Sequence, residues 1–524
     1  MKKSYEMFMK EIDDSALYKG LLQYGLFSEK LPPIFTSEAF YQYCQRTNIQ
    51  LQRNSYDYIH FETVRNTNAP RLLGIPHPFA YENLCRVIKD NWSEIREKLC
   101  DNTRGDSYRI SRLHIQRYAA GKVFFEMNYK NWRVDESPEA DIRIGKRYVV
   151  NADISTCFPS IYTHSLPWAL VGKEVAKKNR KKGEWYNQVD AACQKIRNGE
   201  THGLMIGPHT SNLLSEIILT GVDNKLKNRY DYIRNIDDYI CYVSSMEEAQ
   251  RFLTDLSECL QEYDLSVNHK KTHIAQLPTP TKEHWVREIG ELAYHISDKG
   301  VNYIQVSKYL DSLVELMYRH DNNLAVFKYG IKVLAKHKLT DNARKYYIKT
   351  ILHFADIYPY LVPLLEQYVF VSHHTNPEEI KSFSEKLFAS AYNTKNYEAL
   401  SYVLYFAIRY DFRIVFVDEL LKKDYENSNS CLYKLFSWLY YKKHGMDDKV
   451  KVMKSIAKDM KTDDNLFDQN WIFIYEILSM GLLKEEWKKV KTEADFEKNI
   501  GGKSVLDEAE WSRYKEKNEL LESM

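Results

Sequence analysis

Three acidic residues at the ends of β-like segments constrain this chain most strongly. Asp153 ends the run Tyr-Val-Val-Asn-Ala, whose β-branched and aromatic residues predict a strand. Asp237 and Asp238 lie between two further β-like runs, residues 232–236 and 239–243, which predict a hairpin with both acids at its turn. A strand that ends in one carboxylate and a hairpin that carries two can bring three carboxylates into one cluster.

Such a cluster predicts a specific chemistry. Carboxylates held together repel one another unless cations bind them, and their hard oxygen atoms suit Mg²⁺, with Mn²⁺ as an alternative. Two such ions, about 3.5–4 Å apart, activate an attacking hydroxyl and stabilise a leaving pyrophosphate, as in nucleotide polymerases. Each acidic site alone also has a structural explanation, because Asp is common at strand ends and favours turns.

Composition limits how this chain can contact nucleic acid. Its 524 residues predict two to four domains, and its net charge of +2 excludes a strongly basic protein. Nucleic-acid contact must therefore come from local patches. The lysine-rich segment 173–182 is one candidate, although it also fits a solvated helix face. The 40 tyrosines supply core packing, and some can stack on bases or offer hydroxyls.

The remaining bulk features predict a soluble protein of the cytoplasm. None of the eight cysteines forms a C-x-x-C pair, which fits a reducing compartment. The first residues meet acidic side chains at once and lack the apolar region of a signal peptide. No stretch approaches the ~18 uncharged apolar residues of a membrane span, so no membrane partner is expected.

The pattern along the chain predicts an α+β protein. Residues 1–140 combine helical and loop patterns, whereas residues 141–305 carry the strands, of which Val301–Val306 is predicted to be the last. Residues 306–524 are almost purely helical in pattern, with segments separated by short polar breaks such as His444-Gly-Met-Asp-Asp. That pattern favours a HEAT-like helical repeat, with an irregular helical domain as the alternative.

Four segments, in order, resemble motifs A to D of reverse transcriptases related to group II intron and retron enzymes. They begin at Asp153 (Asp-Ile-Ser-Thr-Cys-Phe-Pro-Ser), Gly203 (Gly-Leu-Met-Ile-Gly-Pro-His-Thr-Ser), Arg234 (Arg-Asn-Ile-Asp-Asp-Tyr) and Tyr263 (Tyr-Asp-Leu-Ser-Val-Asn-His-Lys-Lys). The resemblance implies the right-hand polymerase fold, with an N-terminal extension and fingers in residues 1–140 and the palm in residues 141–305.

The same resemblance implies roles for single residues. The expected ligands of two Mg²⁺ ions are Asp153, Ile154, Asp237 and Asp238. The three aspartates are also the expected catalytic residues. Lys271 matches the lysine of motif D that protonates or neutralises pyrophosphate, although it also fits a surface lysine.

Further residues are implied at the substrate. Ile154 is expected beside the incoming nucleotide, and Phe158 matches the steric gate that excludes a 2′-hydroxyl and so favours dNTPs; a core aromatic is the alternative. Gly207 and Ser211 match the motif B turn and helix start that support the templating pair. The fingers do not align with the family, and the candidate triphosphate ligands there are Arg112, Arg117 and Lys122.

Departures from the pattern narrow the resemblance. Ile206 precedes the motif B glycine, Asn235 replaces the usual motif C tyrosine, and Gly74-Ile-Pro-His-Pro stands where a fingers block is expected. No maturase, endonuclease or retron thumb signal follows the palm. The helical C-terminal part instead resembles the bacterial abortive-infection and related unknown-group reverse transcriptases.

That subfamily implies DNA synthesis in antiphage defence, by homo-oligomers. Synthesis is either primed by a protein hydroxyl without a template or templated by a cognate non-coding RNA. Two alternatives remain open from the sequence: a non-catalytic scaffold that binds RNA or protein through a reverse transcriptase fold, and the reverse transcriptase of a mobile element. Intact Asp153, Asp237, Asp238 and Phe158 argue against the scaffold, because a scaffold needs none of them.

Overall fold

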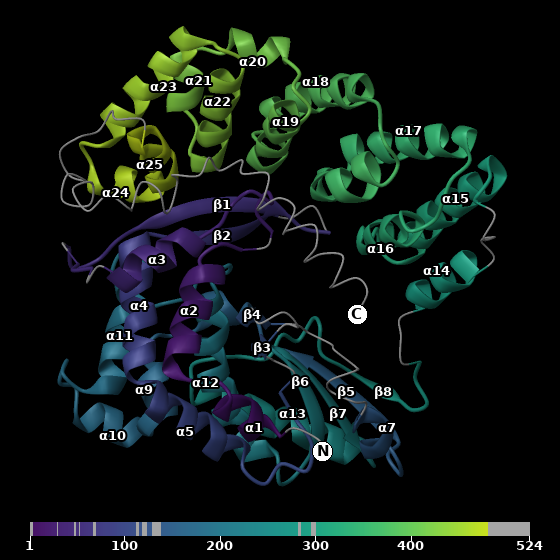
Figure 1. Cartoon of the computed structure of the whole chain (residues 1–524). Coiled ribbons are helices and arrows are strands. Elements are labelled where there is room, and N and C mark those ends of the chain that lie inside the picture. Colours follow the sequence, from purple (N-terminus) through teal and green to yellow (C-terminus); the bar gives the residue numbers. More distant parts are fainter. Residues whose placement is uncertain are drawn as a thin grey trace. The chain divides into compact units, whose positions relative to one another are not determined.

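The chain folds into two compact units. A computed structural model describes residues 4–28, 30–46, 49–51, 53–66, 70–111, 115–117, 123–127, 138–280, 284–294 and 300–479. The first unit combines residues 1–59 with residues 74–279, and the second combines residues 60–73 with residues 280–483 (Figure 1). Each unit is considered by itself below.

The strands form three separate sheets. They are β1 (Tyr58–Val64), β2 (Pro70–Pro76), β3 (Ile115–Arg117), β4 (Val123–Met127), β5 (Tyr148–Asp153), β6 (Asp231–Asn235), β7 (Asp238–Val243) and β8 (His273–Gln276). β1 pairs with β2, β3 pairs with β4, and the remaining strands form an antiparallel sheet in the order β6-β7-β5-β8. β1 to β4 were not predicted from the sequence.

Helices make up most of the first unit. They are α1 (Tyr5–Lys10), α2 (Asp14–Tyr24), α3 (Glu38–Arg46), α4 (Pro78–Asp90), α5 (Trp92–Thr103), α7 (Pro138–Ile142), α8 (Cys157–Ser160), α9 (Ser165–Val171), α10 (Lys173–Lys178), α11 (Trp185–Lys195), α12 (His209–Leu226) and α13 (Met246–Gln261). Within this unit, α13 packs on β5 and β7 and covers one face of the sheet.

The described part of the second unit is helical apart from the hairpin residues. It holds α14 (His284–Tyr294), α15 (Tyr303–Arg319), α16 (Ala325–Leu334), α17 (Asp341–Ile357), η1 (Pro359–Leu364), η2 (Glu366–Val371), α18 (Pro377–Asn393), α19 (Tyr397–Arg409), α20 (Val415–Glu419), α21 (Lys422–Glu426), α22 (Cys431–Lys443), α23 (Asp447–Met460), α24 (Asp464–Gln469) and α25 (Trp471–Ser479). None of the helices among the described residues is both long and apolar enough to cross a membrane.

The predicted strand and hairpin of the acidic residues are confirmed as β5 and as β6 with β7. β5 buries Val149, Val150 and Ala152, so it lies in the middle of the sheet between β7 and β8. β6 and β7 pair along their whole length, from Asp231 opposite Tyr242 to Asn235 opposite Asp238. The acidic residues therefore lie at one end of the sheet.

The predicted strand Val301–Val306 is wrong. Asn302 caps a helix there: its side chain accepts a hydrogen bond from the Gln305 N–H (3.0 Å), and the Gln305 side chain accepts one from the Asn302 N–H (2.9 Å). This reciprocal capping satisfies backbone donors that a helix start leaves unpaired. The segment therefore begins α15, and Val301 forms only an isolated bridge to Leu339.

The helical pattern predicted for residues 306–524 is confirmed in α19. Leu400, Val403, Leu404 and Ala407 are all buried in α19, which packs on α18 and α22. The polar break His444-Gly-Met-Asp-Asp separates α22 from α23, and Gly445 takes a positive φ of 67° there. Helices that are neighbours in sequence thus pack on one another through this stretch.

Candidate active site

The register of the sheet brings the acidic residues together. Asp153, the last residue of β5, lies directly opposite Asp238, the first residue of β7. Beyond this pair, the Ile154 N–H donates a hydrogen bond of 3.1 Å to the Asp237 carbonyl oxygen. The sequence predicted this meeting of motifs A and C, and paired backbones now join Asp153, Ile154, Asp237 and Asp238.

The turn between β6 and β7 is tight and strained. Because Asn235 pairs with Asp238, only Ile236 and Asp237 form the loop. Ile236 has a φ of 55°, a region that β-branched residues rarely adopt and that glycine ordinarily supplies in such turns. Such a strained conformation persists only where the surrounding structure enforces it, and this turn carries Asp237 at the tip of the hairpin.

The carboxylate of Asp153 is buried and doubly bound. Only 6% of the residue is exposed. Its Oδ1 accepts a hydrogen bond from Asn268 Nδ2 and its Oδ2 accepts one from Lys271 Nζ, both at 2.8 Å. The structure thus brings Lys271 to the acidic residues, as the sequence predicted. Asn268 was not predicted from the sequence, although it lies only three positions before Lys271 in the same motif.

Negative charge accumulates at Asp238. Loss of solvation, then the charge of Asp237, and then a hydrogen bond and charge repulsion with Asp153 raise the pKa of Asp238 to about 7, against a smaller opposite effect of Lys271. The residue is nevertheless exposed at the surface, so solvent moderates the first contribution. The repulsion from Asp237 and Asp153 also raises the pKa of Asp238, and it follows from the strand register that places these residues together.

The three carboxylates have the right chemistry for a divalent cation, but their side chains are not arranged around one metal position. Three carboxylates supply hard oxygen ligands, and bound cations would relieve their mutual repulsion. However, no three His, Cys, Asp or Glu side chains converge on one metal position within the described residues. Asp153 instead pairs with Lys271, whose side chain is 61% exposed.

Motif A continues directly into the expected nucleotide side of the site. Phe158 lies in the short helix α8 and is half-buried, unlike the fully buried core aromatics. The Leu204 N–H donates to the Phe158 carbonyl (2.7 Å), and the Gly203 N–H donates to the Ile161 carbonyl (2.8 Å). These bonds join α8 to the motif B loop.

Gly207 and Ser211 lie where that loop enters α12. Ser211 is buried in the first turn of the helix. Gly207 has a φ of +135°, and a Cβ at this position would lie 3.0 Å from the Gly74 carbonyl oxygen. The Gly74 N–H also donates to the Ile206 carbonyl (2.9 Å). The block Gly74-Ile-Pro-His-Pro thus contacts the motif B loop through the backbone.

This contact makes Gly207→Ala a sensitive substitution. The new Cβ meets a backbone oxygen, and the required φ strains any L side chain, which costs on the order of 1–3 kcal/mol. We expect the free energy of unfolding in urea to fall by about that amount. Gly183→Ala is the matched control, because a Cβ there meets nothing within 4 Å and the backbone is ordinary. Equal stability of the two variants would contradict the expectation.

The structure describes little of the candidate triphosphate ligands of the fingers. Arg112 and Lys122 are outside the described residues, and of Arg117 only the backbone, at the end of β3, is described.

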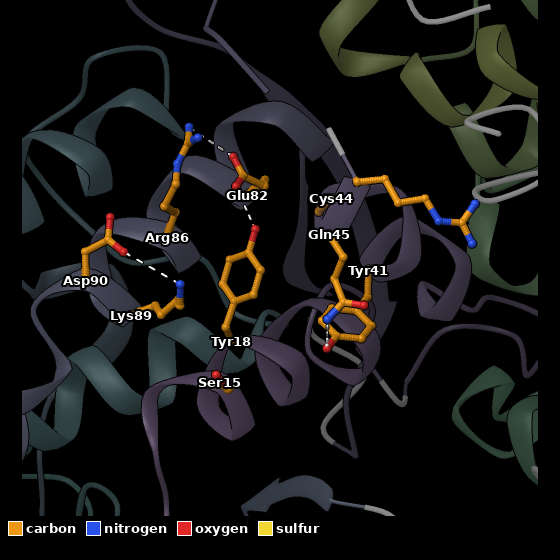
Figure 2. Close-up of a pocket in the computed structure, with 10 residues that line it drawn as sticks. Ser15, Tyr18, Tyr41, Cys44, Gln45, Glu82, Arg86, Lys89 and Asp90 are labelled. Carbon is orange, nitrogen blue, oxygen red and sulfur yellow. Dashed lines mark hydrogen bonds and ion pairs between the residues drawn. The ribbon is translucent and has the colours of Figure 1, made fainter. Parts of the chain in front are cut away.

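A separate polar cavity of about 510 Å³ lies among α2, α3 and α4 (Figure 2). There the Tyr18 hydroxyl donates to the Glu82 carboxylate (2.7 Å) beside Arg86. None of the predicted site residues lines this cavity.

Comparison with known families assigns the segment that holds these residues. Residues 106–306 match the family described as reverse transcriptase (RNA-dependent DNA polymerase). This segment is a reverse transcriptase domain. It contains all four motif-like segments and the three aspartates Asp153, Asp237 and Asp238. The prediction of an RNA-directed DNA polymerase is therefore confirmed at the level of this domain.

Solved structures similar to the chain include yeast telomerases. Apo telomerase from Candida tropicalis truncated from the C-terminal domain is 14% identical, with 47% of this chain and 55% of that chain covered and a TM-score of 0.28. Apo telomerase from Candida tropicalis is 11% identical, with 80% of this chain and 77% of that chain covered and a TM-score of 0.32. Telomerase from Candida albicans in complex with a TWJ fragment of telomeric RNA is 10% identical, with 72% of this chain and 66% of that chain covered and a TM-score of 0.29.

The chain spans about half the length of the first of these telomerases. No curated protein matches its sequence.

Proposed function

We propose that this protein is a DNA polymerase that adds dNTPs by two-metal catalysis at the end of the β6-β7-β5-β8 sheet. The observation that carries the proposal is the register that sets Asp153 opposite Asp238, with Ile154 bonded to the Asp237 backbone. A reverse transcriptase domain over the same residues supports it. The backbone pairing brings three aspartates to the same end of the sheet.

Asp153, Asp237 and Asp238, with the carbonyl group of Ile154, would hold two Mg²⁺ ions, or Mn²⁺ in their place. When bound, the ions activate the attacking hydroxyl and stabilise the leaving pyrophosphate. Lys271 is exposed enough to leave Asp153 and carry a proton to the pyrophosphate. Asn268, also bonded to Asp153, keeps that carboxylate oriented while the lysine moves.

The biological setting is proposed from the resemblance to abortive-infection reverse transcriptases. The protein would act in antiphage defence in the bacterial cytoplasm, as a homo-oligomer that binds its DNA product and, where synthesis is templated, a cognate non-coding RNA. Residues 1–140 would supply the fingers, residues 141–305 the palm and residues 306–524 a HEAT-like repeat. The sequential packing of α18, α19 and α22 supports the last assignment.

A direct assay tests the proposed activity. Purified protein with Mg²⁺ and labelled dNTPs, with and without added primer and template, should form labelled polymer. Removal of the metal with EDTA should abolish the product, and Mg²⁺ or Mn²⁺ should restore it. No incorporation under any of these conditions would refute the polymerase assignment.

The nature of the primer is a separate prediction. Asn235 stands at the position of the usual motif C tyrosine, a residue that in the family lies near the primer end. We expect a tyrosine hydroxyl to act as primer, activated by a metal ion despite an ordinary pKa near ~10. The product should then stay attached to protein through SDS and phenol and be released by protease. Product released by ribonuclease or alkali would identify an RNA primer instead.

One observation favours the alternative of a non-catalytic scaffold. Lys271 neutralises Asp153, and within the described residues the carboxylates do not converge on a single metal position. A scaffold would bind no Mn²⁺ at these residues and would keep its antiphage effect without them. Metal binding measured by electron paramagnetic resonance separates the two functions.

A further inference from the structure

A completely buried arginine lies behind the catalytic turn. Arg234, on β6, has no exposed surface. Its Nε and Nη2 donate to the Asp223 carboxylate at 2.6–3.1 Å, and its Nη1 donates to Glu216 Oε2 at 3.1 Å. Nη1 also donates to the Ile236 carbonyl oxygen at 3.0 Å. One guanidinium therefore joins two carboxylates of α12 to the turn that carries Asp237.

The two carboxylates are themselves held in place. The Tyr232 hydroxyl donates to Asp223 Oδ1 at 3.0 Å, and the Tyr5 hydroxyl donates to Glu216 Oε1 at 3.3 Å. Both acids are almost fully buried. A planar guanidinium with donors in a fixed fork can satisfy two carboxylates and a carbonyl at once, which an ammonium cannot do with the same geometry.

The strain of the turn gives this network a role beyond packing. Ile236 holds a φ of 55°, which an isoleucine does not keep unless its surroundings enforce it. Two bonds enforce it from opposite sides. Arg234 binds the Ile236 carbonyl, and the Ile154 N–H binds the Asp237 carbonyl. Together they fix the peptide groups on both sides of Asp237.

We propose that Arg234 is a positioning residue that clamps the strained Ile236-Asp237 turn to α12 and so sets Asp237 and Asp238 opposite Asp153. This inference rests on the proposed polymerase function. The same helix begins beside Gly207 and Ser211. Arg234 therefore connects the turn that carries Asp237 to α12, whose first turn holds Ser211, a residue expected near the nucleotide.

The test separates positioning from stability. Arg234→Lys keeps a positive charge beside Asp223 but cannot also reach Glu216 and the Ile236 carbonyl. Among folded molecules, we expect kcat for dNTP incorporation to fall at least fivefold, with KM for dNTP within threefold of wild type. The affinity for Mn²⁺ should weaken at least threefold. Arg229→Lys is the matched control, since Arg229 forms a surface ion pair with Asp255 and should change none of these values.

A second substitution asks whether the strain is what Arg234 opposes. Glycine adopts a positive φ without penalty. Ile236→Gly introduced into Arg234→Lys should therefore recover at least threefold in kcat, although it removes a buried side chain and lowers the melting temperature. A purely structural arginine predicts no such recovery.

Each outcome decides the inference. A folded Arg234→Lys variant whose kcat falls less than fivefold overturns it, as does a double variant without recovery. If Arg234→Lys does not fold, Glu216→Gln replaces it, because its neutral amide removes the negative charge that binds Nη1; a kcat loss below twofold there also overturns the inference. If the wild-type protein and Arg229→Lys show no incorporation, the proposed function fails. The clamp is then judged by Mn²⁺ affinity alone, which must still weaken in Arg234→Lys.

Discussion

Asp237→Ala is expected to abolish metal-dependent dNTP incorporation. The backbone bond between Ile154 and the Asp237 carbonyl survives the substitution, so the turn should keep its place. What disappears is a carboxylate that would bind the catalytic ions. We expect the rate to fall at least about a hundredfold, which corresponds to roughly 2.7 kcal/mol in the barrier. Mn²⁺ binding should weaken in parallel.

The matched control for this variant is Asp231→Ala. Asp231 lies at the opposite end of β6 and pairs with Lys146 at the surface, away from the acidic residues. Its loss should leave incorporation within about threefold. A decrease below about tenfold for Asp237→Ala would contradict the proposed metal site. Antiphage protection that survives Asp237→Ala would favour the scaffold.

The acidic part of the site could be predicted because its signals are local. Period-2 patterns and turn residues around Asp153 and Asp237 define strands, and antiparallel pairing then leaves few ways to arrange their ends. Lys271 became a candidate because it lies in the last of four ordered motifs; the structure pairs it with Asp153, and its catalytic role stays a prediction. The structure adds the register, with Asp153 opposite Asp238.

The supporting shell could not be predicted, because it depends on contacts distant in sequence. An arginine in a strand ordinarily suggests a solvent-facing position. Arg234 is instead fully buried, where it forms ion pairs with Glu216 and Asp223 of α12. Asn268 reaches Asp153 only because the segment before β8 folds against the end of β5, where Val267 forms a bridge to Ile154. Nor does the sequence reveal that the Val64 N–H of the β1–β2 hairpin donates to Glu398 (2.6 Å), which places residues 60–73 with the helical unit.

The error at residues 301–306 has a simple physical cause. Val-Asn-Tyr-Ile-Gln-Val alternates as a strand does, and its β-branched residues favour that structure. The capping pair of Asn302 and Gln305 satisfies backbone groups at the start of a helix, whereas among the described residues no strand pairs with this segment. A capping box of four residues thus outweighed the strand-like alternation.

Phe158→Ala is expected to admit ribonucleotides. The side chain follows β5 directly, in α8, and its half-buried ring is not part of the packed core. If the ring lies beneath the sugar of the incoming nucleotide, its removal opens space for a 2′-hydroxyl. Incorporation of rNTPs relative to dNTPs should then rise at least about tenfold, or roughly 1.4 kcal/mol in discrimination.

The control for this experiment is Phe354→Ala, which removes a half-buried ring from α17 in the helical unit. It should leave the rNTP-to-dNTP ratio unchanged. Both variants should be compared at equal folded fractions, since either loses some buried apolar surface. If Phe158→Ala discriminates as strongly as wild type, Phe158 serves packing and another group must exclude the 2′-hydroxyl. Increased rNTP use confined to Phe158→Ala would assign the ring to the sugar of the incoming nucleotide.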